Sequence, residues 1–124
     1  MYEKLTPVLI VDAIEPVLPL WDALGFKRTA ELPHEGRLGF VILTADSIEV
    51  MYQTRASAGA DIPAAAAAGT SCLFLTVHSL DAVEPLLPGG VEVIERRRKT
   101  FYGSTETIVR DAAGNIVTFA QMGT

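Results

Sequence analysis

A pattern repeated at a fixed distance limits most strongly the folds that this chain can adopt. Thr6–Leu20 and Cys72–Pro88 each begin with strand-like alternation and continue into a short helical run. Both contain a valine, two further residues, an aliphatic residue and an acid, at Val11–Glu15 and Val77–Asp81. The two valines lie 77 − 11 = 66 positions apart, which is about half of the 124 residues. This spacing predicts an internal duplication, and hence a fold of two similar modules.

The first half of the chain reads as a strand, a helix and three further strands. Apolar residues that alternate or run continuously predict strands over Leu5–Val11, Phe26–Glu31, Arg37–Thr44 and Ile48–Gln53. Between the first two strands, apolar residues recur at spacings of three and four, which predicts a helix over Asp12–Leu24. Pro19 lies close to the limit for a helix start, so the regular helix is expected to begin late.

The second half repeats this order. Strands are predicted over Cys72–Val77, Val91–Arg97, Thr105–Arg110 and Ile116–Gln121. A short helix, Leu80–Leu87, is expected after Ser79 as its N-cap. Turn residues at Asp111–Asn115 include Gly114, which can adopt positive φ. The sequence therefore predicts one α+β domain of two tandem βαβββ modules.

The modules are predicted over residues 1–54 and 71–124, with a linker at residues 55–70. The linker is rich in alanine and glycine and has no apolar periodicity. Pro63–Ala68 can form one or two helical turns with Asp61 as their cap. A mobile lid is the alternative interpretation of this segment.

Composition excludes several classes of partner. With 49% hydrophobic and 20% charged residues, the chain can fill a core and is not disordered. A net charge of −5 argues against nucleic acid and anionic membranes as partners. The single cysteine and a charged start that runs directly into a strand favour the cytoplasm over secretion. No apolar run approaches the roughly 20 residues that span a bilayer.

Two modules of this kind, paired edge to edge, are expected to form an open half-barrel trough. The strand faces turned away from the helices would line it. Alternation places ten residues there: Thr6, Val8, Ile10, Glu49, Met51, Cys72, Phe74, Thr76, Thr118 and Ala120. A mostly apolar lining with one carboxylate is typical of a small-molecule pocket.

Two segments carry a resemblance to a known family. They are "VDAIEPVLPLWDALGF", which ends the first strand and forms the helix, and the final "VRDAAGNIVTFAQ". Together with the βαβββ repeat, they resemble the vicinal oxygen chelate superfamily, which includes glyoxalase I, extradiol dioxygenases and bleomycin-resistance proteins. The resemblance covers almost the whole chain and implies the glyoxalase/bleomycin-resistance fold. These segments mark the fold and not the function.

The resemblance also implies four cavity positions that hold a divalent metal, usually through His, Gln and Glu. In this sequence the positions fall on Thr6, Glu49, Cys72 and Thr118. Only Glu49 is a ligand that hard divalent metals prefer. His34 and His78 lie outside the trough, in a turn and at a strand end. We therefore expect neither a metal nor another cofactor.

A trough without a metal site favours the bleomycin-resistance-like branch, whose members bind a drug without changing it and are typically dimers. We expect a homodimer that binds a small, partly aromatic and cationic molecule, as in antibiotic sequestration. Glu49 would pair with the cationic group and Met51 would supply an adaptable apolar lining. The stacking walls would be Phe40, Phe74 and Tyr102, and the remaining lining Thr6, Cys72 and Thr118.

Two alternatives remain open. One is a metal-dependent enzyme of the glyoxalase or dioxygenase type, and the other is a dimeric module with no retained ligand site. A basic run, Arg96–Lys99, overlaps the end of a predicted strand, and alternation on a strand divides such a run between two faces. A solvated edge is the simplest interpretation of this run, and an edge that recognises anions is the alternative. Glu106 and Arg110, four apart on one strand face, are expected to pair across strands.

Overall fold

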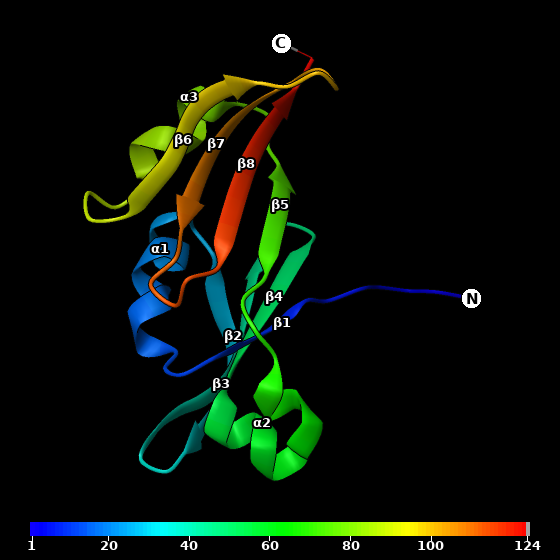
Figure 1. Cartoon of the computed structure of the whole chain (residues 1–124), viewed down its shortest axis with the longest axis vertical. Helices are drawn as coiled ribbons and strands as arrows, with labels where there is room; N and C mark the ends of the chain where they lie inside the picture. Colours follow the sequence, from blue (N-terminus) through cyan, green and yellow to red (C-terminus); the bar gives the residue numbers. More distant parts are fainter. Residues whose placement is uncertain (124) are drawn as a thin grey trace. The chain divides into compact units, whose positions relative to one another are not determined.

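The computed structural model describes residues 1–123, and the chain divides into two units that repeat one order of elements (Figure 1). Unit 1 is Met1–Thr70 and unit 2 is Ser71–Thr124. Each unit contains a mixed four-stranded sheet and a short helix between its first two strands. The α+β fold of two βαβββ modules is thus confirmed. Residue 124, the end of the predicted second module, lies outside the described residues.

Sheet 1 belongs to unit 1 and has the order β1-β4-β3-β2. Its strands are β1 (Val8–Val11), β2 (Lys27–His34), β3 (Arg37–Ala45) and β4 (Ile48–Thr54). β1 runs parallel to β4, and the other neighbours are antiparallel. Strand β2 extends through His34, which was expected in a turn, so the turn is shorter than predicted.

Helix α1 (Leu18–Ala23) follows a 3₁₀ turn at Glu15–Val17, which confirms the expected late start. The predicted apolar stripe is buried at Val17, Leu20 and Trp21. The Trp21 indole donates a hydrogen bond of 3.0 Å to the Tyr52 hydroxyl on β4. This contact places α1 on the face of sheet 1 that carries Tyr52, and the two buried aromatic side chains form the centre of the unit 1 core.

Residues 55–70, predicted as a linker, contain helix α2 (Arg55–Asp61) and a 3₁₀ helix at Pro63–Ala67. The Thr54 hydroxyl caps α2 by accepting from the Ser57 amide at 3.1 Å. Asp61 is the last residue of α2, so its predicted capping role is wrong. The Arg55 guanidinium donates to the carbonyl oxygens of Ala66 and Ala68 at 2.6 and 2.8 Å, which ties the 3₁₀ helix to the start of α2.

Sheet 2 belongs to unit 2 and has the matching order β5-β8-β7-β6. Its strands are β5 (Cys72–Thr76), β6 (Glu92–Lys99), β7 (Ser104–Arg110) and β8 (Ile116–Met122). Helix α3 (Leu80–Val83) continues into a 3₁₀ turn at Glu84–Leu86. The Ser79 hydroxyl accepts from the Ala82 amide at 3.3 Å, which confirms the predicted N-cap. Gly114 has φ 92°, as the predicted turn requires.

Each sheet has one face beneath its helix, α1 or α3, and one opposite face, which we call the distal face. Leu80 at the start of α3 donates its amide to Gln121, so the distal face of sheet 2 is the one without Gln121. Register and alternation then place on the distal face of sheet 1, among others, Val8, Ile10, Phe40, Ile42, Glu49, Met51 and Gln53. The distal face of sheet 2 includes Cys72, Phe74, Thr76, Ser104, Glu106, Ile108, Thr118 and Ala120.

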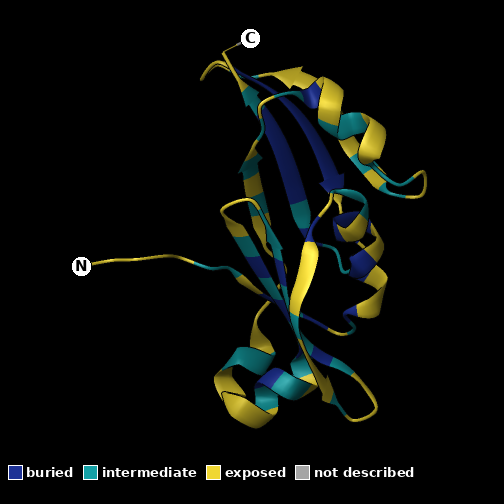
Figure 2. Ribbon diagram, turned by 180° about the vertical axis from the view of Figure 1, so that it is seen from behind, coloured by how far each residue is buried: buried dark blue, intermediate teal, exposed yellow. Residues whose placement is uncertain are grey.

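The buried residues in Figure 2 follow β7 and β8 for most of their length. Within residues 1–123, no helix has the length and apolar character needed to cross a bilayer. The half-barrel trough, the homodimer and the cytoplasmic location stay predictions.

Candidate functional site

Glu49 is the centre of a small polar cluster on the distal face of sheet 1. Its Oε1 accepts hydrogen bonds from the Lys4 ammonium at 3.0 Å and from the Thr6 hydroxyl at 3.1 Å. The hydrogen bond from Lys4 is the main reason that the pKa of Glu49 lies below its ordinary value, although burial opposes it. The carboxylate is therefore ionised at neutral pH. The structure brings together two of the four predicted positions, Thr6 and Glu49.

An apolar row continues from this cluster along β4. Met51 follows Glu49 on the same face and lies between Val8 of β1 and Ile42 of β3. Phe40 lies one step further along, opposite Gln53. Phe40 and Met51 are partly buried, whereas Val8 is 45% exposed. Sheet 1 therefore offers a ligand one negative charge at one end and an apolar surface beyond it.

The other two predicted metal positions, Cys72 and Thr118, lie on the distal face of sheet 2. The Cα of Cys72 is opposite Ile116, and the Cα of Thr118 is opposite Phe74. Cys72 and Thr118 are thus two residues out of register. Cys72 is exposed, whereas Thr118 is only 9% exposed. Thr6 and Glu49, in contrast, are in direct contact.

The donor atoms at these four positions do not fit the divalent metal that the resemblance implies. Glu49 supplies the one carboxylate, and the Lys4 ammonium already occupies it. The Thr6 hydroxyl donates its hydrogen bond to the same oxygen. Across residues 1–123, the structure has no group of three or more His, Cys, Asp or Glu side chains arranged to hold a metal ion. Hard divalent cations need several oxygen or imidazole ligands at once.

The distal face of sheet 2 contains a buried carboxylate that was not among the predicted site residues. Glu106 on β7 has no exposed side-chain area. Its Oε1 accepts from Nε and Nη2 of Arg98 on β6 at 3.1 and 2.9 Å. Its other oxygen accepts from Ser104 at 2.8 Å and from the Tyr102 hydroxyl. Arg110 pairs with Glu92 of β6 at 3.0 Å, so the expected cross-strand pairing of both Glu106 and Arg110 is confirmed.

Burial by itself would raise the pKa of Glu106. The hydrogen bonds from Tyr102, Ser104 and Arg98 outweigh this effect and hold the pKa below its ordinary value. The ionised carboxylate in turn fixes Tyr102 by its hydroxyl, while that residue stays 45% exposed. The anchored ring meets Phe101 edge-on, with ring centroids 5.1 Å apart.

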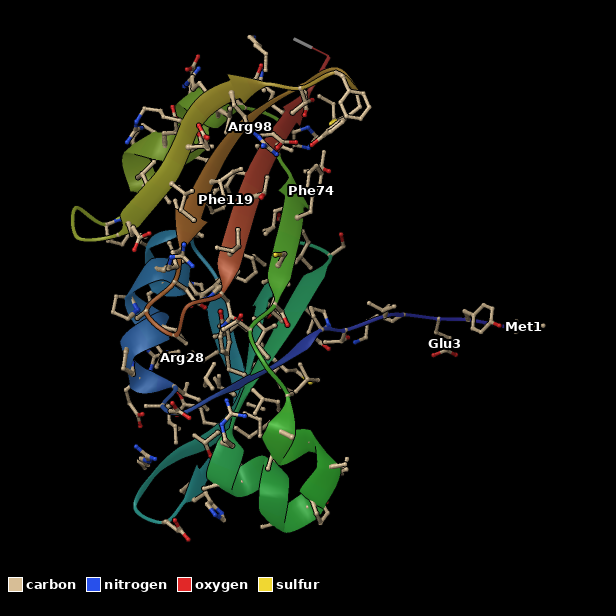
Figure 3. All side chains as sticks on the ribbon, viewed as in Figure 1. Met1, Glu3, Arg28, Phe74, Arg98 and Phe119 are labelled. Carbon is tan, nitrogen blue, oxygen red and sulfur yellow. The ribbon has the colours of Figure 1, made fainter. Side chains whose placement is uncertain are left out.

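Two of the predicted stacking residues are therefore available on unit 2. Phe74 is 54% exposed on β5, where Figure 3 labels its side chain. Tyr102 lies in the turn after β6. Phe101 in the same turn is fully exposed.

The chain is similar to a known protein family in sequence and to several solved structures in fold. The model of the Glyoxalase/Bleomycin resistance protein/Dioxygenase superfamily matches residues 8–119. A glyoxalase/bleomycin resistance protein/dioxygenase structure from Nocardioides covers 99% of this chain and 85% of its own, with a TM-score of 0.77 and 11% identity. TioX from Micromonospora sp. ML1 covers 98% and 99%, with a TM-score of 0.78 and 16% identity.

A lactoylglutathione lyase structure from Agrobacterium tumefaciens covers 96% of this chain and 92% of its own, with a TM-score of 0.76 and 16% identity. No functionally curated protein matches the chain in sequence. At such low identities these structures establish the fold alone. Whether the chain binds a ligand or catalyses a reaction must be argued from the residues of the site.

Proposed function

Because the chain belongs to the Glyoxalase/Bleomycin resistance protein/Dioxygenase superfamily, we propose that it binds a small, partly aromatic organic cation without transforming it. The observation that carries this proposal is the state of Glu49. It is the only carboxylate among the four positions where the resemblance implies metal ligands, and it is ionised and held by Lys4 and Thr6.

The Glu49 cluster is suited to exchange one cation for another. The Lys4 side chain is 60% exposed, and ion pairs of exposed groups contribute only about 0–1 kcal/mol. A ligand cation can therefore replace the ammonium of Lys4 at little cost. Thr6 keeps the carboxylate in place during this exchange, and Met51 and Phe40 offer an apolar surface to the rest of the ligand.

The same cluster is poorly suited to catalysis. A carboxylate whose pKa is lowered is a weak base, and its hydrogen-bond partners hold it as the anion. The donor set does not fit a divalent metal, which is the Lewis acid that the family's enzymes would need. Sequestration of a toxic organic cation, such as an antibiotic, is the function that these properties support best.

Isothermal titration of the full chain with three naphthalene compounds tests the proposal. They carry an amidinium, an amide or a carboxylate and otherwise have the same shape. We expect the amidinium compound to bind most tightly and Glu49→Gln to weaken it about tenfold, because a charge-assisted contact is lost. Asp22→Asn is the matched control, since Asp22 is an exposed carboxylate paired with Arg28. Equal binding of the amidinium and amide compounds, or an equal loss in the control, would overturn the proposal.

The rival function, a metal-dependent enzyme of the glyoxalase or dioxygenase type, has a separate test. The purified chain is dialysed against Ni²⁺, Mn²⁺ or Fe²⁺ and then against metal-free buffer, and the retained metal is measured by elemental analysis. If the chain retains one metal ion and Glu49→Gln abolishes this retention, the metal-dependent enzyme becomes the better supported function. We expect no retention above that of the variant.

A further inference from the structure

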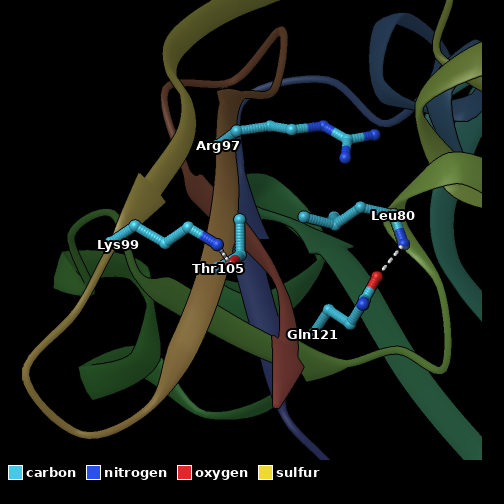
Figure 4. A pocket seen from close by; sticks show the side chains of 5 residues that line it. All are labelled: Leu80, Arg97, Lys99, Thr105 and Gln121. Carbon is cyan, nitrogen blue, oxygen red and sulfur yellow. Dashed lines mark hydrogen bonds between the residues drawn. The ribbon is translucent and has the colours of Figure 1, made fainter. Parts of the chain in front are cut away.

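A pocket lies in unit 2 on the face of sheet 2 that α3 covers, opposite the distal face (Figure 4). Its volume is about 250 Å³, and it is lined by Leu80, Arg97, Lys99, Thr105 and Gln121. Leu80 and Thr105 are buried, with 1% and 6% exposure, whereas Arg97 and Lys99 are exposed. Buried side chains thus form the floor of the pocket, and exposed basic side chains form its rim.

The basic rim results from an irregularity in β6. Arg97 has φ 55°, and the register between β6 and β7 slips by one residue between Glu95 and Arg98. Arg96 and Arg97 therefore both reach Glu84, the first residue of the 3₁₀ turn that follows α3. After this bulge the alternation resumes: Arg98 binds Glu106 on the distal face, and Lys99 returns to the helix side. The predicted division of the basic run between two faces is confirmed.

Lys99 differs from the other basic residues of unit 2 in its partners. Within the described residues of this unit, each of the other four has a carboxylate within 4.0 Å. The pairs are Arg96 with Glu84, Arg97 with Asp81 and Glu84, Arg98 with Glu106, and Arg110 with Glu92. The Lys99 ammonium donates to the Thr105 hydroxyl at 2.8 Å and, in this part of the chain, has no carboxylate partner. An ammonium has three donors, so two remain for a ligand.

Gln121 supplies a second donor to the pocket. Its Oε1 accepts from the Leu80 amide at 2.7 Å, as Figure 4 shows, which fixes the orientation of the side-chain amide. Its NH₂ group is then directed away from that contact. No buried side-chain nitrogen among the described residues lacks a partner, so this NH₂ group reaches solvent. The pocket therefore presents the Lys99 ammonium and the Gln121 amide to an incoming acceptor.

We propose that this pocket binds a small organic carboxylate, which accepts hydrogen bonds from Lys99 and Gln121. The apolar part of the ligand lies against Leu80 and the hydrocarbon stem of Arg97. Because Asp81 and Glu84 already neutralise Arg97, Lys99 alone supplies the net charge, which selects a monoanion. A volume of 250 Å³ equals about eight water volumes of roughly 30 Å³, which suits a compact acid of the size of butanoate or benzoate. The site is independent of Glu49 and of the cation binding proposed above.

NMR titration of the full ¹⁵N-labelled chain with butanoate and benzoate, each compared with its uncharged amide, tests this site. The backbone amides of Leu80 and Thr105 and the side-chain NH₂ of Gln121 are expected to shift and saturate with the carboxylates only. Lys99→Met keeps the hydrocarbon stem and should weaken binding about tenfold, because it removes one charge-assisted hydrogen bond. Lys99→Arg, which keeps the charge, should retain most of the affinity and shows that the position tolerates substitution.

Arg96→Met is the matched control. It changes the net charge of the chain by the same amount, but Arg96 does not line the pocket. We expect its affinity to stay within about twofold at an ionic strength of 0.15 M, where charges beyond roughly 8 Å are screened. An equal loss in Arg96→Met, equal binding of the amides, or shifts that never saturate would overturn the proposal. Carboxylate binding should also survive Glu49→Gln, which separates this result from the test of cation binding.

Discussion

Arg98 holds the carboxylate of Glu106 from the neighbouring strand through two nitrogen atoms, at 3.1 and 2.9 Å from one oxygen. The arginine is 47% exposed, whereas the glutamate has no exposed area. A partly exposed cation thus neutralises a carboxylate that is buried inside unit 2. A buried carboxylate is stable only when its oxygens are fully hydrogen-bonded, and here Ser104 and Tyr102 complete the set.

Replacing Glu106 with alanine should destabilise the protein by about 2–4 kcal/mol, because the partly buried Arg98 and Tyr102 and the buried Ser104 all lose their acceptor. Chemical denaturation of the wild type and Glu106→Ala measures this difference. Glu92→Ala is the matched control, since Glu92 pairs with Arg110 between the same two strands but is 61% exposed. A loss in the control as large as that in Glu106→Ala would contradict the role assigned to burial.

The lowered pKa of Glu106 also predicts how stability depends on pH. In the unfolded chain the carboxyl group takes up its proton near its ordinary value of 4.5, whereas in the folded chain it does so only at lower pH. Its contribution to the free energy of unfolding is therefore complete above about pH 4.5 and is lost as the pH falls through the folded pKa. Denaturation curves between pH 3 and 7 should show a weaker acid dependence for Glu106→Gln than for the wild type. Parallel curves would contradict this prediction.

The buried hydrogen bond from Trp21 to Tyr52 joins α1 to sheet 1. Tyr52→Phe removes the acceptor and leaves the indole N–H of Trp21 buried without it, which should cost about 1–3 kcal/mol. The fluorescence of Trp21, the single tryptophan, should also change in the folded state. Tyr2→Phe is the control, because Tyr2 is 93% exposed. Unchanged stability of Tyr52→Phe would show that the hydrogen bond is dispensable.

Gly39 on β3 has no space for a side chain. A Cβ at this position would lie 2.4 Å from the Cβ of His34 on β2 and 3.3 Å from that of Ser57 on α2. Gly39→Ala should therefore force these elements apart and destabilise the protein by about 1–3 kcal/mol. A Cβ at Gly69 meets nothing within 4 Å, so Gly69→Ala serves as the control in thermal unfolding. Equal melting temperatures of the two variants would contradict the close approach.

The strands and the duplication were predictable because alternation survives in the sequence wherever one face is buried. Leu9, Val11, Val50 and Tyr52 illustrate this pattern in β1 and β4. Helix α2 was missed because its residues, "RASAGAD", have no apolar stripe. It is fixed by the Thr54 cap and by the contacts of Arg55, and neither appears as periodicity.

The candidate site was predictable in part. Contact between Thr6 and Glu49 followed from the family positions, whereas the register of Cys72 against Ile116 depends on strand pairing that no local pattern specifies. Glu106 reads as an ordinary strand carboxylate. Its burial depends on Tyr102 and Arg98, and the alignment of Arg98 depends on the slip in β6.

The bulge at Arg97, whose backbone is in the left-handed region, determines which mutations unit 2 can accept. If β6 lost this bulge but kept all its residues, strict alternation would turn Arg98 and Lys99 to the opposite faces of the sheet, whereas deletion of one residue would remove the bulge and keep both faces. The contact of Arg98 with the buried Glu106 and the place of Lys99 in the proposed carboxylate pocket therefore depend on the same extra residue. A point substitution at Lys99, by contrast, changes the pocket and leaves Arg98 in place.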